Sequence, residues 1–75
     1  MKNLSLNILD IRGRTSEEAL QNLIDRVEKI KENDSLWLID NKEPIDCYDY
    51  LLDYDYNFQI FIYSKNEYRV FVSKN

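Results

Sequence analysis

Hydrophobic residues recur along the chain with two spacings, one typical of strands and the other of helices. Strands are predicted where apolar residues alternate with polar ones, or where short apolar runs lie between turn residues. The segment of residues 36–39 is apolar on both faces, which is typical of an interior strand. The predicted strands are the segment with Leu4, Leu6 and Ile8, residues 36–39, and a terminal hairpin of residues 58–63 and 68–72 joined by Lys65 and Asn66.

Two segments carry apolar residues at helical spacing. Thr15 followed by Glu18 is typical of a capping box, in which each side chain bonds the other residue's backbone amide, so a helix is predicted to begin here. It is predicted to end at Asn33 and Asp34. Pro44 fits the first turn of a second helix, because its missing amide needs no partner there. A turn of Asp40, Asn41 and Lys42 is predicted between the strand of residues 36–39 and the second helix. The apolar stripes are Ala19, Leu20, Leu23, Ile24, Val27 and Ile30 in the first helix, and Ile45, Tyr48, Leu51 and Leu52 in the second.

The predicted order is therefore β-α-β-α-β-β, in a single domain covering residues 1–75. Right-handed crossovers place both helices on one side of the sheet, which predicts an α+β fold: a two-layer sandwich with a mixed four-stranded sheet. Its other face would be open, unless the register is off by one residue or the chain ends cover it. If Leu36, Leu38, Ile60, Ile62, Val70 and Val72 face the helices, then Trp37, Ile39, Phe61, Tyr63, Arg69 and Phe71 face outward.

Three short motifs carry a family resemblance. Leu-Asp-Ile-Arg-Gly occupies residues 9–13, Leu-Trp-Leu-Ile residues 36–39, and Glu-Pro-Ile residues 43–45. With the order of elements, these motifs resemble the TusA-like (SirA-like) sulfur-carrier superfamily, and most closely its sister group, domain of unknown function 2249. The resemblance covers roughly residues 6–72 and implies the same β-α-β-α-β-β fold with a mixed sheet.

One position departs from the sulfur-carrier pattern. TusA-like carriers have a Cys-Pro-x-Pro motif at the start of the first helix, where the helix N-terminus favours the thiolate that accepts sulfur. In this chain Ser16 stands at that position, and Glu17 and Glu18 add negative charge beside it. A serine hydroxyl cannot form a persulfide. The resemblance therefore supports the fold but not sulfur carriage at the usual site.

Composition excludes several chemistries. The chain has no histidine, which excludes Ser-His-Asp and Cys-His catalysis and zinc sites of the Cys/His type. Gly13 is the only glycine, so there is no glycine-rich phosphate loop. The aspartates and tyrosines of residues 46–56 match no calcium-binding loop and are interpreted as a solvated acidic face. No catalytic residue, cofactor or metal is predicted.

The net charge of −4 argues against binding to a nucleic-acid backbone or an anionic membrane. A single cysteine cannot form an internal disulfide. No apolar run approaches the roughly 18 residues of a membrane span, and no signal-peptide pattern follows Met1. A cytoplasmic location is expected.

Two local groups could carry chemistry. Cys47, near the start of the second helix, is a possible reactive thiol for sulfur transfer or redox work, although burial and flanking Asp46 and Asp49 favour a packing role. At the first helix, backbone amides and two guanidiniums could hold a small anion, unless the arginines pair with surface acids. That possible anion site consists of Arg12, Gly13, Arg14, Thr15 and Ser16.

The outward aromatic residues give the leading prediction. Exposed apolar surface usually marks an interaction site, and Trp, Tyr and Arg are common anchors. We therefore predict a non-enzymatic binding or adaptor domain that contacts a protein partner, or forms a homodimer, through the open sheet face. Stacking of single-stranded nucleic acid on these rings is disfavoured by the negative charge.

Overall fold

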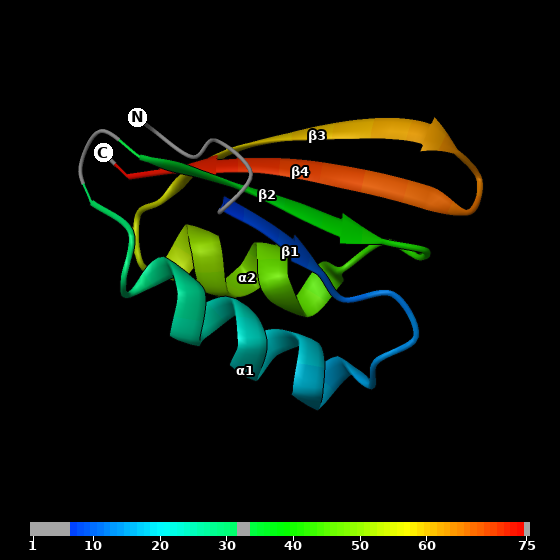
Figure 1. Ribbon diagram of the computed structural model, residues 1–75, viewed down its shortest axis with the longest axis horizontal. Coiled ribbons are helices and arrows are strands. Elements are labelled where there is room, and N and C mark those ends of the chain that lie inside the picture. The colour runs from blue at the N-terminus through cyan, green and yellow to red at the C-terminus, as the bar shows by residue number, and fades with distance from the viewer. Residues whose placement is uncertain (1–6, 32–33, 75) are drawn as a thin grey trace.

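The structure, a computed structural model, describes residues 7–31 and 34–74 and confirms the predicted α+β order. The four strands form one mixed sheet in the order β1-β2-β4-β3, in which β1 is parallel to β2 and β4 is antiparallel to both β2 and β3. Figure 1 shows both helices on the same side of this sheet. The elements are β1 (Ile8–Asp10), α1 (Ser16–Val27), β2 (Ser35–Asp40), α2 (Ile45–Asp53), β3 (Asn57–Ser64) and β4 (Glu67–Ser73).

Helix α1 begins at the predicted capping box. The Thr15 hydroxyl accepts a hydrogen bond from the Glu18 amide, and the Glu18 carboxylate accepts one from the Thr15 amide, both at 3.1 Å. The helix ends at Val27, earlier than predicted, because a tighter turn follows in which the Lys29 amide donates to the Arg26 carbonyl. Ile30 is nevertheless buried, from the loop rather than from the helix. Of the predicted end, Asn33 lies outside the described residues.

The covered face of the sheet supplies most of the core. Leu36 and Leu38 of β2 and Val70 and Val72 of β4 have no exposed surface, as the alternation predicts. They pack with Ala19, Leu23 and Val27 of α1 and with Leu51 of α2. The two central strands are therefore sealed on the helix side.

In β3 the predicted parity holds, but it does not bring burial. Ile60 and Ile62 lie on the helix side by register, opposite Val70 and Tyr68, yet they are 41% and 65% exposed. Only the start of the strand is covered, where Phe58 stacks on Tyr48 of α2 with 5.6 Å between ring centroids. Figure 1 shows the far end of the β3–β4 hairpin projecting past the helices. Ile60 and Ile62 are exposed because the helices do not reach them.

In the first strand, the residues that face the core are not the ones that the alternation of Leu4, Leu6 and Ile8 predicts. Leu4 and Leu6 lie outside the described residues, but Ile8 is 46% exposed whereas Leu9 is buried. The parallel register explains the difference, since it sets Leu9 beside the buried Leu38. Leu9 therefore faces the core.

Helix α2 buries a narrower side than predicted. Cys47 and Leu51, four residues apart, face the core, and Tyr48 is partly buried. Ile45 and Leu52 were expected on the buried side, but both are largely exposed because they flank this narrow stripe. Pro44 precedes the helix as its N-cap, and its carbonyl accepts from the Cys47 and Tyr48 amides. Within residues 7–31 and 34–74, no helix is both long and apolar enough to cross a membrane.

Candidate functional site: the open sheet face

Three aromatic rings from three strands meet on the face opposite the helices. The Trp37 ring lies 4.8 Å from Phe71 and 5.5 Å from Phe61, measured between centroids, in tilted arrangements. Trp37 of β2 is directly opposite Phe71 of β4, so the sheet register itself brings these rings together. Tilted ring pairs at such distances are favourable contacts. We call this group the aromatic cluster.

A charged pair borders the aromatic cluster. The Arg69 guanidinium lies 4.0 Å from the centre of the Tyr63 ring, which is cation–π distance. Its Nε donates to the Glu67 carboxylate at 2.7 Å, and this hydrogen bond raises the pKa of Arg69. The arginine is therefore neutralised by its neighbour rather than left as a free positive charge.

Neither described helix covers this face. Phe61 is 41% exposed and Tyr63 58%, while the other residues predicted to face outward are half-buried among their neighbours. The structure thus places all the predicted interaction residues on one continuous surface. They are Trp37 and Ile39 of β2, Phe61 and Tyr63 of β3, and Arg69 and Phe71 of β4.

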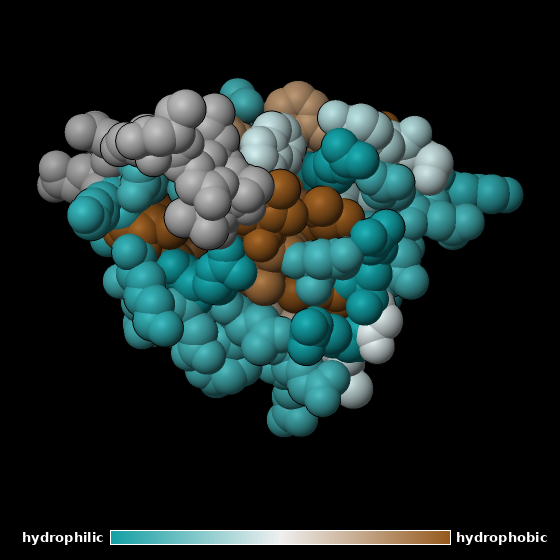
Figure 2. All heavy atoms as spheres, in the orientation of Figure 1, coloured by the Kyte–Doolittle hydropathy of each residue, from teal (hydrophilic) through white to brown (hydrophobic). Residues whose placement is uncertain are grey.

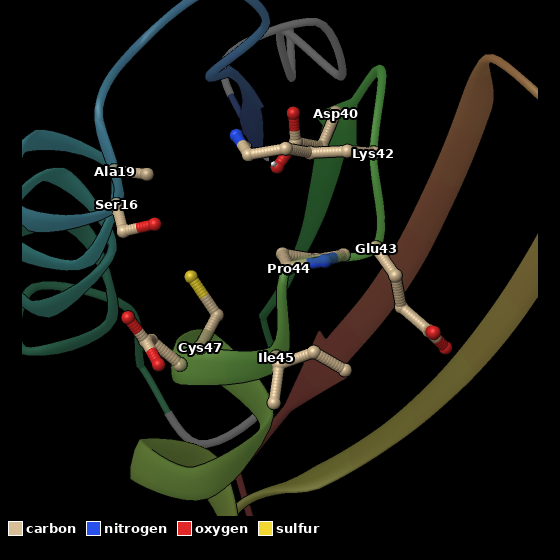
Figure 3. Close-up of a pocket in the computed structure, with 9 residues that line it drawn as sticks. Ser16, Ala19, Asp40, Lys42, Glu43, Pro44, Ile45 and Cys47 are labelled. Atoms are coloured by element: carbon tan, nitrogen blue, oxygen red, sulfur yellow. Dashed lines mark ion pairs between the residues drawn. The ribbon is translucent and has the colours of Figure 1, made fainter.

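The helix side of the molecule has a different surface. Figure 2, which views both layers from one edge, shows a mainly hydrophilic surface over α1 and hydrophobic atoms gathered around β1. A hollow of about 160 Å³ lies between the start of α1, the end of β2 and the start of α2. Figure 3 shows the Cys47 sulfur and the Ser16 hydroxyl both pointing into this hollow, with Asp40 and Lys42 at its other side.

The thiol in this hollow is in its unreactive form at neutral pH. Cys47 is only 2% exposed. Burial, followed by the negative charges of Asp40 and Asp46, raises its pKa to about 11, and nearby Lys42 offsets this only in part. Because the thiolate is the nucleophile, this environment disfavours sulfur chemistry.

Asp40 is a feature of the hollow that the sequence interpretation missed. It was expected in a turn, but it ends β2 and is 1% exposed. Its carboxylate accepts from the Asn41 amide at 2.7 Å, and the Lys42 ammonium lies 3.9 Å away. The alternation that buries Leu36 and Leu38 continues to position 40, so it also predicts that Asp40 is buried. The polar residues that follow Asp40 favoured a turn instead.

The start of α1 is largely satisfied by its own chain. Arg12 binds the Asp10 carboxylate through Nε at 2.9 Å and Nη2 at 2.7 Å, and these bonds lower the pKa of Asp10. Gly13 adopts a φ of 79°, a conformation that favours glycine. The Thr15 amide and hydroxyl are used in the capping box. Arg12, Gly13, Arg14, Thr15 and Ser16 are therefore neighbours, but a small anion would have to compete with these bonds.

The acidic residues of α2 do not converge on a cation. Within the described part of the chain, no group of three or more Asp, Glu or Cys residues is arranged to hold a metal ion. Asp46, Asp49, Asp53 and Asp55 are all exposed.

Comparison with models of known families, with curated proteins and with solved structures gave no match to this chain.

Proposed function

We propose that this chain is a TusA-like domain without enzymatic activity, which binds another protein through the open sheet face. The observation that carries the proposal is the aromatic cluster, built from three strands on a face that no described helix covers. Large aromatic side chains in such positions commonly dominate binding energy at interfaces. The absence of histidine and the raised pKa of Cys47 support a role in contact rather than in bond making.

The chemistry of the face indicates the kind of partner. Its centre is apolar, and its positive charge, Arg69, is paired with Glu67. We therefore expect a partner that presents an apolar, uncharged patch, with hydrogen-bonding groups at the rim. A strongly charged partner surface would have to be desolvated against aromatic rings without compensation.

A matched pair of variants tests the proposal. Phe61→Asp places a charge in the aromatic cluster, whereas Leu52→Asp places the same charge at an exposed apolar position on α2. In affinity capture from the native cell followed by mass spectrometry, we expect Phe61→Asp to reduce recovery of the bound protein at least tenfold, the effect of about 1.4 kcal/mol. Leu52→Asp should retain it.

Trp37 provides a second measurement, because it is the only tryptophan in the chain and belongs to the aromatic cluster. Adding the purified partner should shift its fluorescence to shorter wavelength, since the ring loses contact with water. Equal recovery of the same proteins by the parent and both variants would contradict the proposal. So would a partner that binds without changing the Trp37 emission.

A further inference from the structure

The two edge strands of the sheet differ in how well they are protected against pairing with a strand of another molecule. Strand β1 has only three residues and ends at Asp10, which is paired with Arg12. Strand β3 has eight residues, and residues 56–64 form the longest uncharged run in the sequence. Edge strands are normally protected by shortness, by charge or by proline, because their unpaired backbone groups can bind another strand. Strand β3 has none of these protections.

The pairing geometry of β3 is also suited to a further strand. Its register with β4 is regular from Asn57 to Ile62 and shifts only between Ile62 and Ser64, close to the hairpin turn. In a regular antiparallel strand, backbone N–H and C=O groups that do not bond the neighbour point away from it, here toward the edge that no other described strand occupies. An edge of this kind is a ready template for pairing.

Strand β3 is apolar on both sides. Ile60 and Ile62 are exposed on the helix side, and Phe61 and Tyr63 on the open side. A partner docked flat on the open face would cover Phe61 and Tyr63 but would leave the two isoleucines in water. A strand added at the edge brings side chains to both sides at once. The two-sided exposure therefore points to an edge contact.

We propose that β3 pairs antiparallel with β3 of a second copy of this chain, extending the four-stranded sheet into one of eight strands. A two-fold axis perpendicular to the sheet satisfies the free edges of both copies with one set of hydrogen bonds. It sets residues of the same face opposite each other, so Ile60 or Phe61 lies at the axis. The helices of both copies then share one side, and the two open faces join on the other.

Charge restricts where two copies can meet, and the uncharged, two-sided apolar β3 matches itself. Each chain carries a net charge of −4, so two copies repel across most of their surfaces. Self-pairing of β3 brings no charged residue of either strand against the other. The short, charged β1 edge blocks further addition, so the assembly closes as a dimer instead of growing into a fibre.

The experiment is light scattering across a concentration series, with variants of the two edges. With rising concentration, the parent should approach twice the 9.1 kDa mass of one chain. Ile62→Lys puts a charge on the exposed helix side of β3, away from the open face, and should weaken dimerisation at least tenfold. Ile8→Lys makes the same change on the other edge strand and should dimerise like the parent.

Hydrogen exchange provides the geometric readout. Backbone amides of β3 that point to the free edge should gain protection as concentration rises in the parent, and not in Ile62→Lys.

A monomer at every concentration would overturn the inference, as would a dimer unaffected by Ile62→Lys or weakened equally by Ile8→Lys. A dimer abolished by Phe71→Asp but not by Ile62→Lys would mean that the copies meet through their faces. The inference is independent of the proposed function, because a monomer that still binds a partner through Phe61 would refute only the edge pairing.

Discussion

The two faces of the sheet are made by the same strands but leave very different groups accessible. On the helix side, Leu36 and Val72 have no exposed surface. On the other side, their neighbours Trp37 and Phe71 contact one another and remain half-exposed. The covered side also contains two groups that could take part in reactions, the Cys47 thiol and the Asp40 carboxylate, and both are almost completely buried.

The potentially reactive groups are therefore buried on one side of the sheet, whereas the accessible side chains lie on the other. The Cys47 sulfur points into a hollow where burial, and then the neighbouring carboxylates, oppose its ionisation. The predicted residues of the open face include no thiol and no carboxylate, and they present exposed aromatic area and a positive charge paired with Glu67. The proposed function assigns contact with a partner to the open face and stability to the covered side.

The largest effect should come from neighbouring residues of β2 that point to opposite faces. Leu38→Ala should lower the free energy of unfolding by about 2–5 kcal/mol, because it opens a cavity in a sealed core. For a domain of this size that is a large share of a total of roughly 4–11 kcal/mol. Ile39→Ala, on the half-buried open face, should cost about 1 kcal/mol.

Urea unfolding followed by circular dichroism measures both variants. Equal losses at the two positions would mean that the open face is as important to the core as the covered one. That result would remove the distinction between the faces.

The next effect concerns the thiol. With a pKa of about 11 instead of about 9, Cys47 should have roughly 100-fold less thiolate at neutral pH than an ordinary cysteine. Alkylation by iodoacetamide should be slowed at least that much in the folded protein, and should accelerate about tenfold per pH unit up to pH near 11. The chain unfolded in urea is the control and should react at the ordinary rate.

The same shift has a consequence for stability. The folded state raises the pKa, so it favours the neutral thiol. The resulting stabilisation is complete below the pKa of the unfolded thiol, near 9, and is lost as the pH rises toward 11. Rapid alkylation at neutral pH, or added sulfur after treatment with a persulfide donor, would instead support sulfur transfer or redox chemistry at Cys47.

Local signals in the sequence were sufficient for much of this architecture. The capping box at Thr15 and Glu18 needs only residues three apart, and the alternation in β2 and β4 correctly identifies Leu36, Leu38, Val70 and Val72 as core. The same alternation also brought Trp37, Phe61 and Phe71 to one face.

The rest depended on how far elements extend in space. Ile60 and Ile62 have the correct parity for the core, but nothing in their own sequence shows that the helices stop short of them. The phase of β1 is set by its pairing with β2, which buries Leu9 beside Leu38. The enclosure of Cys47 beside Asp40 requires the end of β2 and the start of α2 to meet, which is a tertiary arrangement.

The smallest predicted effect distinguishes two neighbouring hydroxyls at the start of α1. Thr15→Ala removes the side-chain acceptor of the capping box and should cost about 1 kcal/mol, whereas Thr15→Ser should largely preserve stability. Ser16→Ala should change stability by less than about 0.5 kcal/mol, because that hydroxyl points into the hollow and is not part of the cap. The measurement is again urea unfolding.

Ser16 occupies the position where the TusA-like resemblance would place the sulfur-carrying cysteine, so partner recovery by Ser16→Ala should also be measured. If Ser16→Ala lowered recovery as strongly as Phe61→Asp, binding would involve the hollow, and the covered side would have more than a structural role.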